Sequence, residues 1–461
     1  MKKITVFILL VTCITNAQFA EPYMIDNSEP FRIKVNKINS DNLIDILALY
    51  VNENKVSWYE NTNENGEFGN ETIITQSLVH PAYIDLADLN GDGSMDVLVS
   101  AREDSKVVWY INDGNGNFSP ENVITATNFG QDADKVQAAD IDGDGDMDVV
   151  FALGDQSKLV WFENLNGQGV FSSEKIISNT AIGVYEFDIG DLDGDGDLDI
   201  VCNSSTTGFP SWFKNIDGMG NFGSEIPIDN IGTFNIVISD IDGDGDNDLL
   251  KRELINSTVT LSWLDNVDGM GIFFQRQLIS SLSDPSGMFL IDIDNDYDND
   301  ILVSYVGEGK VGWFENIDGQ GTFGDLQIIE DNLFSARAIY GAKIDNDEFN
   351  DVVVSTSKSL GGGAYEYNLV WYKNLTYLNT QENLLLQLSL TPNPTTGILY
   401  LQAPNSTIES ITVYDVLGKP VLQQNNNLTT IDLSGLQNGM YLVKVTGNNG
   451  GTVVKKVVLS R

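Results

Sequence analysis

Cysteine is almost absent from this chain of 461 residues, which contains only Cys13 and Cys202. Cys13 lies in an N-terminal apolar segment that we expect to be removed, so Cys202 would remain alone and no disulfide could form within the mature chain. The fold must then be stabilised without disulfides. Histidine is equally scarce. The single one, His80, precedes Pro81, and we interpret it as a loop residue rather than a catalytic base.

Basic residues are also few, since 25 lysines and arginines face 67 aspartates and glutamates and leave a net charge of −42. A field of this sign repels phosphate backbones, and no basic patch is visible in the sequence, so nucleic acid is excluded as a partner. Beyond the N-terminus no apolar run is long enough to cross a bilayer. We therefore expect no transmembrane segment in the mature chain.

The N-terminus has the three parts of a secretory signal peptide. Lys2 and Lys3 supply the basic part, residues 6–11 supply the apolar part, and Thr15-Asn16-Ala17 supplies a cleavage site of small residues. Thr12 before Cys13 fits a lipoprotein signal poorly. We expect residues 1–17 to be removed and the mature protein to be exported.

An aspartate-rich loop recurs along most of the chain. Residues 140–148 read Asp-Ile-Asp-Gly-Asp-Gly-Asp-Met-Asp, and close copies occupy residues 88–96, 191–199 and 240–248. A variant lies at residues 292–300, and two worn copies, which begin with Lys37 and Lys343, end at Asp45 and Asp351. The start points are 51, 52, 51, 49, 52 and 51 residues apart. This spacing indicates an internal repeat of one structural unit.

The carboxylates at loop positions 1, 3, 5 and 9 point to a bound cation. Calcium binds six to eight oxygens from carboxylates and backbone carbonyls, and glycines at positions 4 and 6 permit the positive backbone angles that a coiled loop needs. An EF-hand is excluded, because its closing acid falls at position 12 and a helix follows it. The alternative is a solvated acidic turn, and the near-identical copies favour calcium.

Each repeat contains four short apolar segments separated by turn residues, which predicts one small antiparallel sheet. Seven such units predict an all-β protein, with a seven-bladed β-propeller as its main domain. The third segment of each repeat has a tryptophan that we expect to pack between blades: Trp58, Trp109, Trp161, Trp212, Trp263, Trp313 and Trp371. Most are followed by a Gly-x-Gly-x-Phe motif, which we interpret as a tight turn rather than a nucleotide loop.

The two ends of the repeat region complement each other. The seventh repeat stops near Asn374 without a fourth segment, and residues 19–25 match residues 323–329 of the sixth repeat. We expect residues 19–26 to supply the missing outer strand, which would leave no exposed sheet edge. The expected domains are a propeller over residues 18–376, a linker over 377–388 and a small β-sandwich over 389–461.

The repeats resemble the FG-GAP/VCBS type of calcium-binding propeller, which also occurs in integrin α-subunits. This resemblance implies that the acidic loops join the first and second strands of each blade. It also implies calcium ligands in five loops, with four sites expected and the sixth repeat a possible fifth because Asn295 and Tyr297 replace its glycines. These ligands are Asp88, Asn90, Asp92 and Asp96; Asp140, Asp142, Asp144 and Asp148; Asp191, Asp193, Asp195 and Asp199; Asp240, Asp242, Asp244 and Asp248; and Asp292, Asp294, Asp296 and Asp300.

The last segment resembles the type A sorting domain of the type IX secretion system of Bacteroidota. Its marks are Pro392-Asn393-Pro394, the block at residues 414–419 and Gly439-Met440-Tyr441. The resemblance implies that the secretion machinery is a partner. The protein would be secreted, or attached to the outer-membrane surface.

These observations favour a non-enzymatic binding or adhesion module for a glycan or a protein. Its ligand face would be formed by the second-third and blade-to-blade loops, with Tyr83, Phe129, Tyr185, Phe234, Phe334 and residues 360–367. These aromatic residues could equally cap the central channel. The alternative function is an extracellular calcium-dependent lyase or hydrolase of polysaccharides. No catalytic residue is predicted, because no acid pair stands apart from the metal loops.

Overall fold

The structure is a computed structural model that describes residues 18–126, 133–179, 184, 186–203, 209–280, 285–361, 364–375, 389–402, 408–415, 419–425, 428–447 and 452–460. The expected signal peptide and linker lie outside these residues. Two compact units are present, one over Ala20–Asn374 and one that includes Leu375–Arg461. Both bounds of the first unit lie within two residues of those expected for the propeller, 18 and 376.

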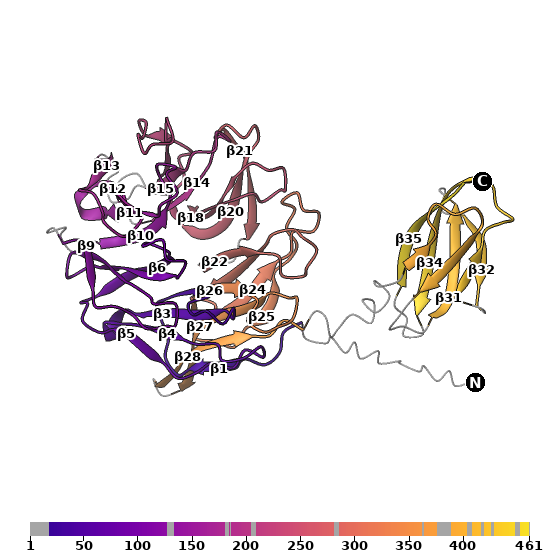
Figure 1. Ribbon diagram of the computed structural model, residues 1–461, viewed down its shortest axis with the longest axis horizontal. Helices are drawn as coiled ribbons and strands as arrows, with labels where there is room; N and C mark the ends of the chain where they lie inside the picture. The colour runs from indigo at the N-terminus through magenta and orange to yellow at the C-terminus, as the bar shows by residue number, and fades with distance from the viewer. Residues whose placement is uncertain are drawn as a thin grey trace, which may run out of the picture. The chain divides into compact units, whose positions relative to one another are not determined.

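The described residues of the first unit form seven four-stranded antiparallel sheets (Figure 1). Six follow the chain order. They are β2 (Arg32–Asn36), β3 (Asp45–Tyr50), β4 (Lys55–Tyr59) and β5 (Thr72–Thr75); β6 (Pro81–Ala87), β7 (Asp96–Ala101), β8 (Lys106–Tyr110) and β9 (Asn122–Thr125); β10 (Ala133–Ala139), β11 (Asp148–Leu153), β12 (Lys158–Phe162) and β13 (Lys175–Ser178); β14 (Phe187–Gly190), β15 (Asp199–Asn203), β16 (Pro210–Phe213) and β17 (Ile226–Pro227); β18 (Thr233–Ser239), β19 (Asp248–Ile255), β20 (Thr258–Asn266) and β21 (Phe273–Ser280); and β22 (Pro285–Ile291), β23 (Asp300–Tyr305), β24 (Lys310–Phe314) and β25 (Gln327–Glu330). Two 3-10 turns, η1 (Val51–Glu53) and η2 (Gly154–Gln156), join second and third strands.

The remaining sheet of this unit combines the two ends of the repeat region. It consists of β26 (Ser335–Ala342), β27 (Asp351–Gly361), β28 (Ala364–Tyr372) and the N-terminal strand β1 (Tyr23–Asp26). β1 pairs antiparallel with β28, and Tyr23 stacks on Trp371 at 4.7 Å between ring centroids. The N-terminal segment therefore covers the edge that β28 would otherwise expose, as the sequence match predicts.

The tryptophans pack between neighbouring sheets, as the sequence predicts. Trp58, on β4, lies in a cluster with Ile84, Val97 and Val99 of the next sheet. Trp371 of the last sheet packs in the same way on Ile33 and other residues of the first, so the packing connects the two ends of the series. Figure 1 shows the sheets around a common centre, and the all-β propeller architecture is confirmed.

The glycine turn behind the tryptophan has a second role that the sequence reading missed. Gly116 has φ +75°, and a Cβ on it would lie 2.2 Å from Cζ2 of Trp58 in the preceding sheet. The same contact recurs around the ring, from Gly169 to Trp109, Gly220 to Trp161, Gly271 to Trp212, Gly321 to Trp263 and Gly66 to Trp371. Since only glycine tolerates both the angle and the close approach, this turn also positions adjacent blades.

The C-terminal unit is the small β-sandwich that the sequence predicts. One sheet contains β29 (Ser389–Thr391), β30 (Ile398–Gln402) and β33 (Thr430–Asp432), and the other contains β31 (Ile408–Asp415), β32 (Pro420–Gln424), β34 (Gly439–Gly447) and β35 (Thr452–Leu459). Leu399, Ile411, Val443 and Val457 of the two sheets share one core. In the propeller unit, Cys202 is a buried free thiol.

Candidate metal centres

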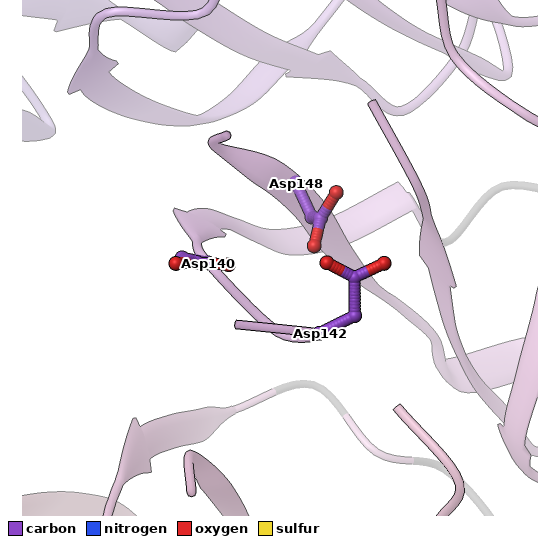
Figure 2. Close-up of side chains that lie close together, drawn as sticks. All are labelled: Asp140, Asp142 and Asp148. Atoms are coloured by element: carbon purple, nitrogen blue, oxygen red, sulfur yellow. The ribbon is translucent and has the colours of Figure 1, made fainter. Parts of the chain in front are cut away.

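Each acidic loop joins the first and second strands of its sheet, so its last aspartate begins the second strand. Four loops bring three carboxylates together, with one oxygen of each within 4.8 Å of the others. These triads are Asp140, Asp142 and Asp148; Asp191, Asp193 and Asp199; Asp240, Asp242 and Asp248; and Asp292, Asp294 and Asp300. Figure 2 shows the first triad, in which Asp142 and Asp148 point toward one another.

The aspartate at position 1 holds the loop in its coiled shape. Asp191 accepts hydrogen bonds from the backbone N–H of Gly194 at 2.8 Å and of Gly196 at 2.9 Å. Both glycines have positive φ angles, +71° and +92°. In the sixth repeat Asn295 and Tyr297 take these positions at +68° and +79° and donate the same bonds to Asp292. The loss of the glycines therefore does not change the course of this loop.

The aspartate at position 9 is a structural residue as well as a candidate ligand. In the third repeat, Asp148 is fully buried. Its Oδ2 accepts the N–H of Ile141 at 3.0 Å, and its Oδ1 accepts the N–H of Asn164 at 2.8 Å. The worn loops keep this acid, as Asp45 and Asp351, and both accept the corresponding bonds. The aspartate at position 9 is thus needed by the blade itself. This accounts for its presence in the two worn loops, which have lysine at position 1.

An asparagine of the following blade fixes each loop from outside. Asn164 Nδ2 donates to the carbonyl of Leu89 in the preceding loop at 2.9 Å. Asn215 does the same to Ile141 at 2.9 Å, and Asn61 donates across the seam to Ile344 at 2.7 Å. The loops are therefore held between two blades. Any change in a loop is transmitted to a blade interface.

The triads contain carboxylate oxygens that the protein itself does not satisfy. Oδ1 atoms of Asp140, Asp142, Asp193 and Asp294 are buried and lack a hydrogen-bond partner within the described chain. Burial and then Asp296 raise the pKa of Asp294 to about 6. Unpaired buried carboxylates are costly, and convergent oxygens of this kind suit a hard cation such as calcium. The residues present therefore fit the cation that the loop motif implies.

The structure reveals a further position that faces the loops, two residues after each blade tryptophan. Here lie the acids Glu163, Asp265 and Glu315, whose charges act on Asp142, Asp242 and Asp294 and raise the pKa of each of these three carboxyls, after burial as the main cause. The fourth repeat has Lys214 instead. The Lys214 ammonium is paired with Asp193, and with Asp195 at 3.0 Å. The sequence could have identified this position, because it lies at a fixed offset of two residues after each blade tryptophan.

The seventh loop shows the same arrangement and changes one interpretation. In the worn loops, the lysine at loop position 1 (Lys37 and Lys343) predicts from the sequence that its ammonium replaces the ion. In the seventh loop the ammonium comes from Lys373, which pairs with Asp345 and, at 3.1 Å, with Asp347. In the first loop the Nζ of Lys37 donates to Asn42 Oδ1 at 3.5 Å.

The remaining predicted ligands are placed less tightly. In the loop of the second repeat, Asn90 takes position 3 and accepts the N–H of Asp92 at 2.9 Å, and Asp88 and Asp96 accept backbone N–H groups as in the other loops. The aspartates at position 5 lie outside the triads and accept the N–H of position 7, as Asp144 does from Asp146 at 2.9 Å. The predicted position 5 ligands are Asp92, Asp144, Asp195, Asp244 and Asp296.

The opposite ends of the first strands open into two adjoining cavities of about 830 and 700 Å³. Of the aromatic residues predicted for the ligand face, Tyr83, Phe234, Phe334 and Tyr367 line them, and Phe129 and Tyr185 lie outside the described residues. His80 also lines the larger cavity, with φ +54° and its Nδ1 3.4 Å from Glu103. The cavity and the acidic loops lie at opposite ends of the same strands.

Comparison with protein families finds two matches. The FG-GAP-like repeat matches four overlapping segments, residues 37–99, 88–151, 140–202 and 191–251. The secretion system C-terminal sorting domain matches residues 389–460. A domain of the second kind implies export through that secretion system. Among the described residues, no helix has the length and apolar character needed to cross a membrane.

Among characterised relatives, ulvan lyase NLR42 of Nonlabens ulvanivorans is 25% identical over 93 residues. The match spans 20% of this chain and 17% of that protein. Among solved structures, an Agrocybe aegerita lectin that recognises non-reducing terminal N-acetylglucosamine has a TM-score of 0.50 and 23% identity, covering 67% of this chain and 81% of the lectin. A chain of the BBS1N–ARL6DN complex has a TM-score of 0.51 and 10% identity, covering 77% and 98%. At these identities the likenesses show the fold alone.

Proposed function

Because the chain carries FG-GAP-like repeats followed by a secretion-system sorting domain, we propose that it is an exported, calcium-stabilised β-propeller that binds a glycan or a protein. The sorting domain would engage the type IX machinery, and the protein would then be released or held at the outer-membrane surface. The signal peptide expected at residues 1–17 would direct the first step of export.

Calcium has a structural role in this proposal. The triad carboxylates, together with the position 5 aspartates and the carbonyl at position 7, would hold the ion, and its charge would offset their mutual repulsion. At millimolar calcium, a site with an affinity of about 0.1 mM would stabilise the fold by about 1.4 kcal/mol. Since each loop is clamped by an asparagine of the next blade, this stabilisation extends to the blade interfaces.

The observation that carries the binding function is the cavity at the end of the strands opposite the metal loops. Tyr83, which lines the cavity, lies five residues before Asp88, the first residue of the acidic loop. This separation corresponds to about 17 Å along the strand. The cavity is lined by aromatic and charged side chains, among them Phe31, Tyr83 and Phe334. Concave surfaces with a few placed polar groups are the usual sites of ligand binding. Calcium would therefore support the cavity without touching the ligand.

A polysaccharide-degrading enzyme is the second candidate. It is favoured by the place of His80 and Tyr83 in the lining of the same cavity, since an imidazole or a phenol can act as a general base. The local similarity to an ulvan lyase covers 17% of that protein and leaves the choice between enzyme and binding module open.

Incubation of the mature chain with a panel of polysaccharides and extracellular proteins in calcium buffer tests both candidates. Retention on a polysaccharide without new chain ends, abolished by a chelator, supports the binding module. New chain ends that disappear in His80→Ala or Tyr83→Phe would establish the enzyme instead. A failure to retain any polysaccharide or any extracellular protein would remove the proposal.

A further inference from the structure

The cavity collects the arginines of a chain that has very few basic residues. Residues 20–374 contain five arginines, and four of them, Arg32, Arg102, Arg252 and Arg337, line the two adjoining cavities. Of the 13 lysines in this segment, the described lining of the two cavities contains two, Lys34 and Lys135. Arginine rather than lysine is the residue that recognises planar or trigonal anions through two parallel hydrogen bonds. Its concentration here, against a net charge of −42, distinguishes this surface from the rest of the protein.

Arg32 is held in a fixed position at the centre of this surface. Its guanidinium lies 3.7 Å from the centroid of the Tyr83 ring. Its Nε donates to the carbonyl of Ala82 at 3.2 Å, and its Nη2 is 3.3 Å from Glu186. A guanidinium that is stacked and hydrogen-bonded along one edge loses little freedom when it binds an anion.

Lys135 adds a second positive charge next to Arg32, and its side chain is the more buried of the two. Its Nζ lies 3.9 Å from carboxylates of both Glu186 and Asp188, and its side chain is 12% exposed. Burial by itself would lower the pKa of Lys135, but Tyr83, Asp188 and Glu186 together raise it above the usual range. The ammonium is therefore charged at all physiological pH values. It donates to the backbone carbonyl of Phe187, and its distances to the two carboxylates are longer than direct hydrogen bonds.

Arg337 lies at a more accessible position, with a side chain that is 45% exposed and its Nε 3.5 Å from Glu29. Large aromatic side chains stand beside it. Phe31, Phe334 and Tyr367 line the same cavity and are 45%, 53% and 46% exposed. Aromatic faces of this kind can pack on the C–H surfaces of sugar rings, while the arginines contact charged substituents.

On the basis of the proposed binding function, we propose that this cavity binds an anionic glycan, with Arg32, Lys135 and Arg337 contacting its carboxylate or sulfate groups. An acidic peptide shares the charge but has fewer flat C–H surfaces to cover the exposed aromatic rings, so the glycan accounts for more of the lining. The anion would bind where four of the five arginines of residues 20–374 line adjoining cavities.

Calorimetric titration of the mature full-length chain in calcium tests this assignment. The probes are oligogalacturonides for the carboxylate, sulfated galactan oligosaccharides for the sulfate, uncharged galactan oligosaccharides of equal length, and an oligoaspartate peptide. The variant is Arg337→Gln, because an exposed arginine can be replaced without loss of the fold. Arg337→Lys keeps the charge, and Lys158→Gln removes a charge from a partly exposed pair with Glu174 away from the cavity. Thermal unfolding verifies that each variant is folded.

At least one charged oligosaccharide should bind, more weakly at high salt, and Arg337→Gln should weaken it by about tenfold or more. Arg337→Lys should restore part of that loss, and Lys158→Gln should have no effect. Equal binding of the uncharged oligosaccharides, with no effect of Arg337→Gln, would overturn the anionic ligand and leave the binding function standing. Binding of the oligoaspartate alone would overturn the glycan. If the chain binds none of these probes and is also not retained on any polysaccharide or protein of the panel described above, the proposed function fails as well.

Discussion

Lys214 makes the fourth acidic loop different from its neighbours, although its aspartates match the motif. Its ammonium pairs with Asp193 and Asp195, two of the predicted ligands, and occupies the place where a cation would bind. Sister loops have Glu163, Asp265 or Glu315 at the same position. We therefore expect the loop of residues 191–199 to bind calcium more weakly than the loops of residues 140–148, 240–248 and 292–300.

The size of the effect follows from the two ion pairs that calcium must break. The Lys214 and Asp195 side chains are 31% and 34% exposed, and Asp193 is 10% exposed. Pairs that solvent reaches contribute about 0.2–1 kcal/mol each, and the pair with Asp193 lies at the upper end of this range. Repulsion between the displaced ammonium and the divalent ion adds to this, although solvent screens it. Lys214→Met removes both costs. We expect it to lower the free energy of calcium binding at this loop by about 1–2 kcal/mol, which is about 5- to 30-fold in affinity.

Equilibrium dialysis at a series of free calcium concentrations measures the number of ions bound per chain. Lys214→Met should bind one more ion than the natural protein at intermediate calcium. Its unfolding midpoint should be higher than that of the natural protein in calcium and no higher in chelator, where the variant lacks the ion pairs. Glu163→Gln, at the same position of the third repeat, should weaken its own loop. An unchanged binding curve for Lys214→Met would refute the competition between lysine and calcium.

Three further predictions concern stability. Chelation should lower the free energy of unfolding of the propeller by about 1.4 kcal/mol per site that calcium fills tenfold above its dissociation constant. Calorimetry with and without chelator would show this as a lower thermal midpoint, and equal midpoints would remove the structural role of the ion. Burial raises the pKa of Asp45 to about 6 and of Asp351 to about 7, so the folded state binds these protons more tightly than the unfolded state. In chelator, stability should therefore fall as pH rises from about 4 through 7, as denaturant midpoints would reveal, and a rise over this range would contradict the burial argument. Gly169→Ala should cost at least about 1 kcal/mol more than Gly145→Ala, because the new Cβ would lie 2.3 Å from Trp109, whereas Gly145 has nothing within 4 Å. Both variants share the strain of a positive φ, so equal losses in chelator would show that the contact with tryptophan is unimportant.

Sequence periodicity was sufficient to predict the parts of the fold that recur. Alternating segments and turn residues identified the strands, and the position of Trp58 and its counterparts identified the blade interfaces. The match of residues 19–25 to the sixth repeat predicted the pairing of β1 with β28. Each of these features satisfies the same physical need in every blade, so it leaves a repeated pattern in the chain.

Contacts between blades were harder to predict, because they join residues about 60 or 75 positions apart whose side chains give no sign of a partner. The contact of Gly116 with Trp58 and the bond from Asn164 to Leu89 are examples. The double role of Asp148, as a hydrogen-bond acceptor for the backbone and as a candidate ligand, could not be predicted either, since its spacing alone favours a ligand. Only the geometry shows that backbone N–H groups bind both of its oxygens.

The functional differences lie at equivalent positions that vary from blade to blade. The residue five positions before the acidic loop is Arg32, Tyr83, Lys135 and Glu186 in four consecutive blades, and these four side chains meet in the cavity. The residue two positions after the tryptophan is acidic in four blades, lysine in two and Ile111 in the second. On the proposal above, it modulates how well each acidic loop accepts a cation. A ring of equal units places every equivalent position at the same depth. Residues that vary at one such position therefore form the proposed binding surface, while the recurring residues form the scaffold. Sequence recurrence alone cannot identify the variable residues.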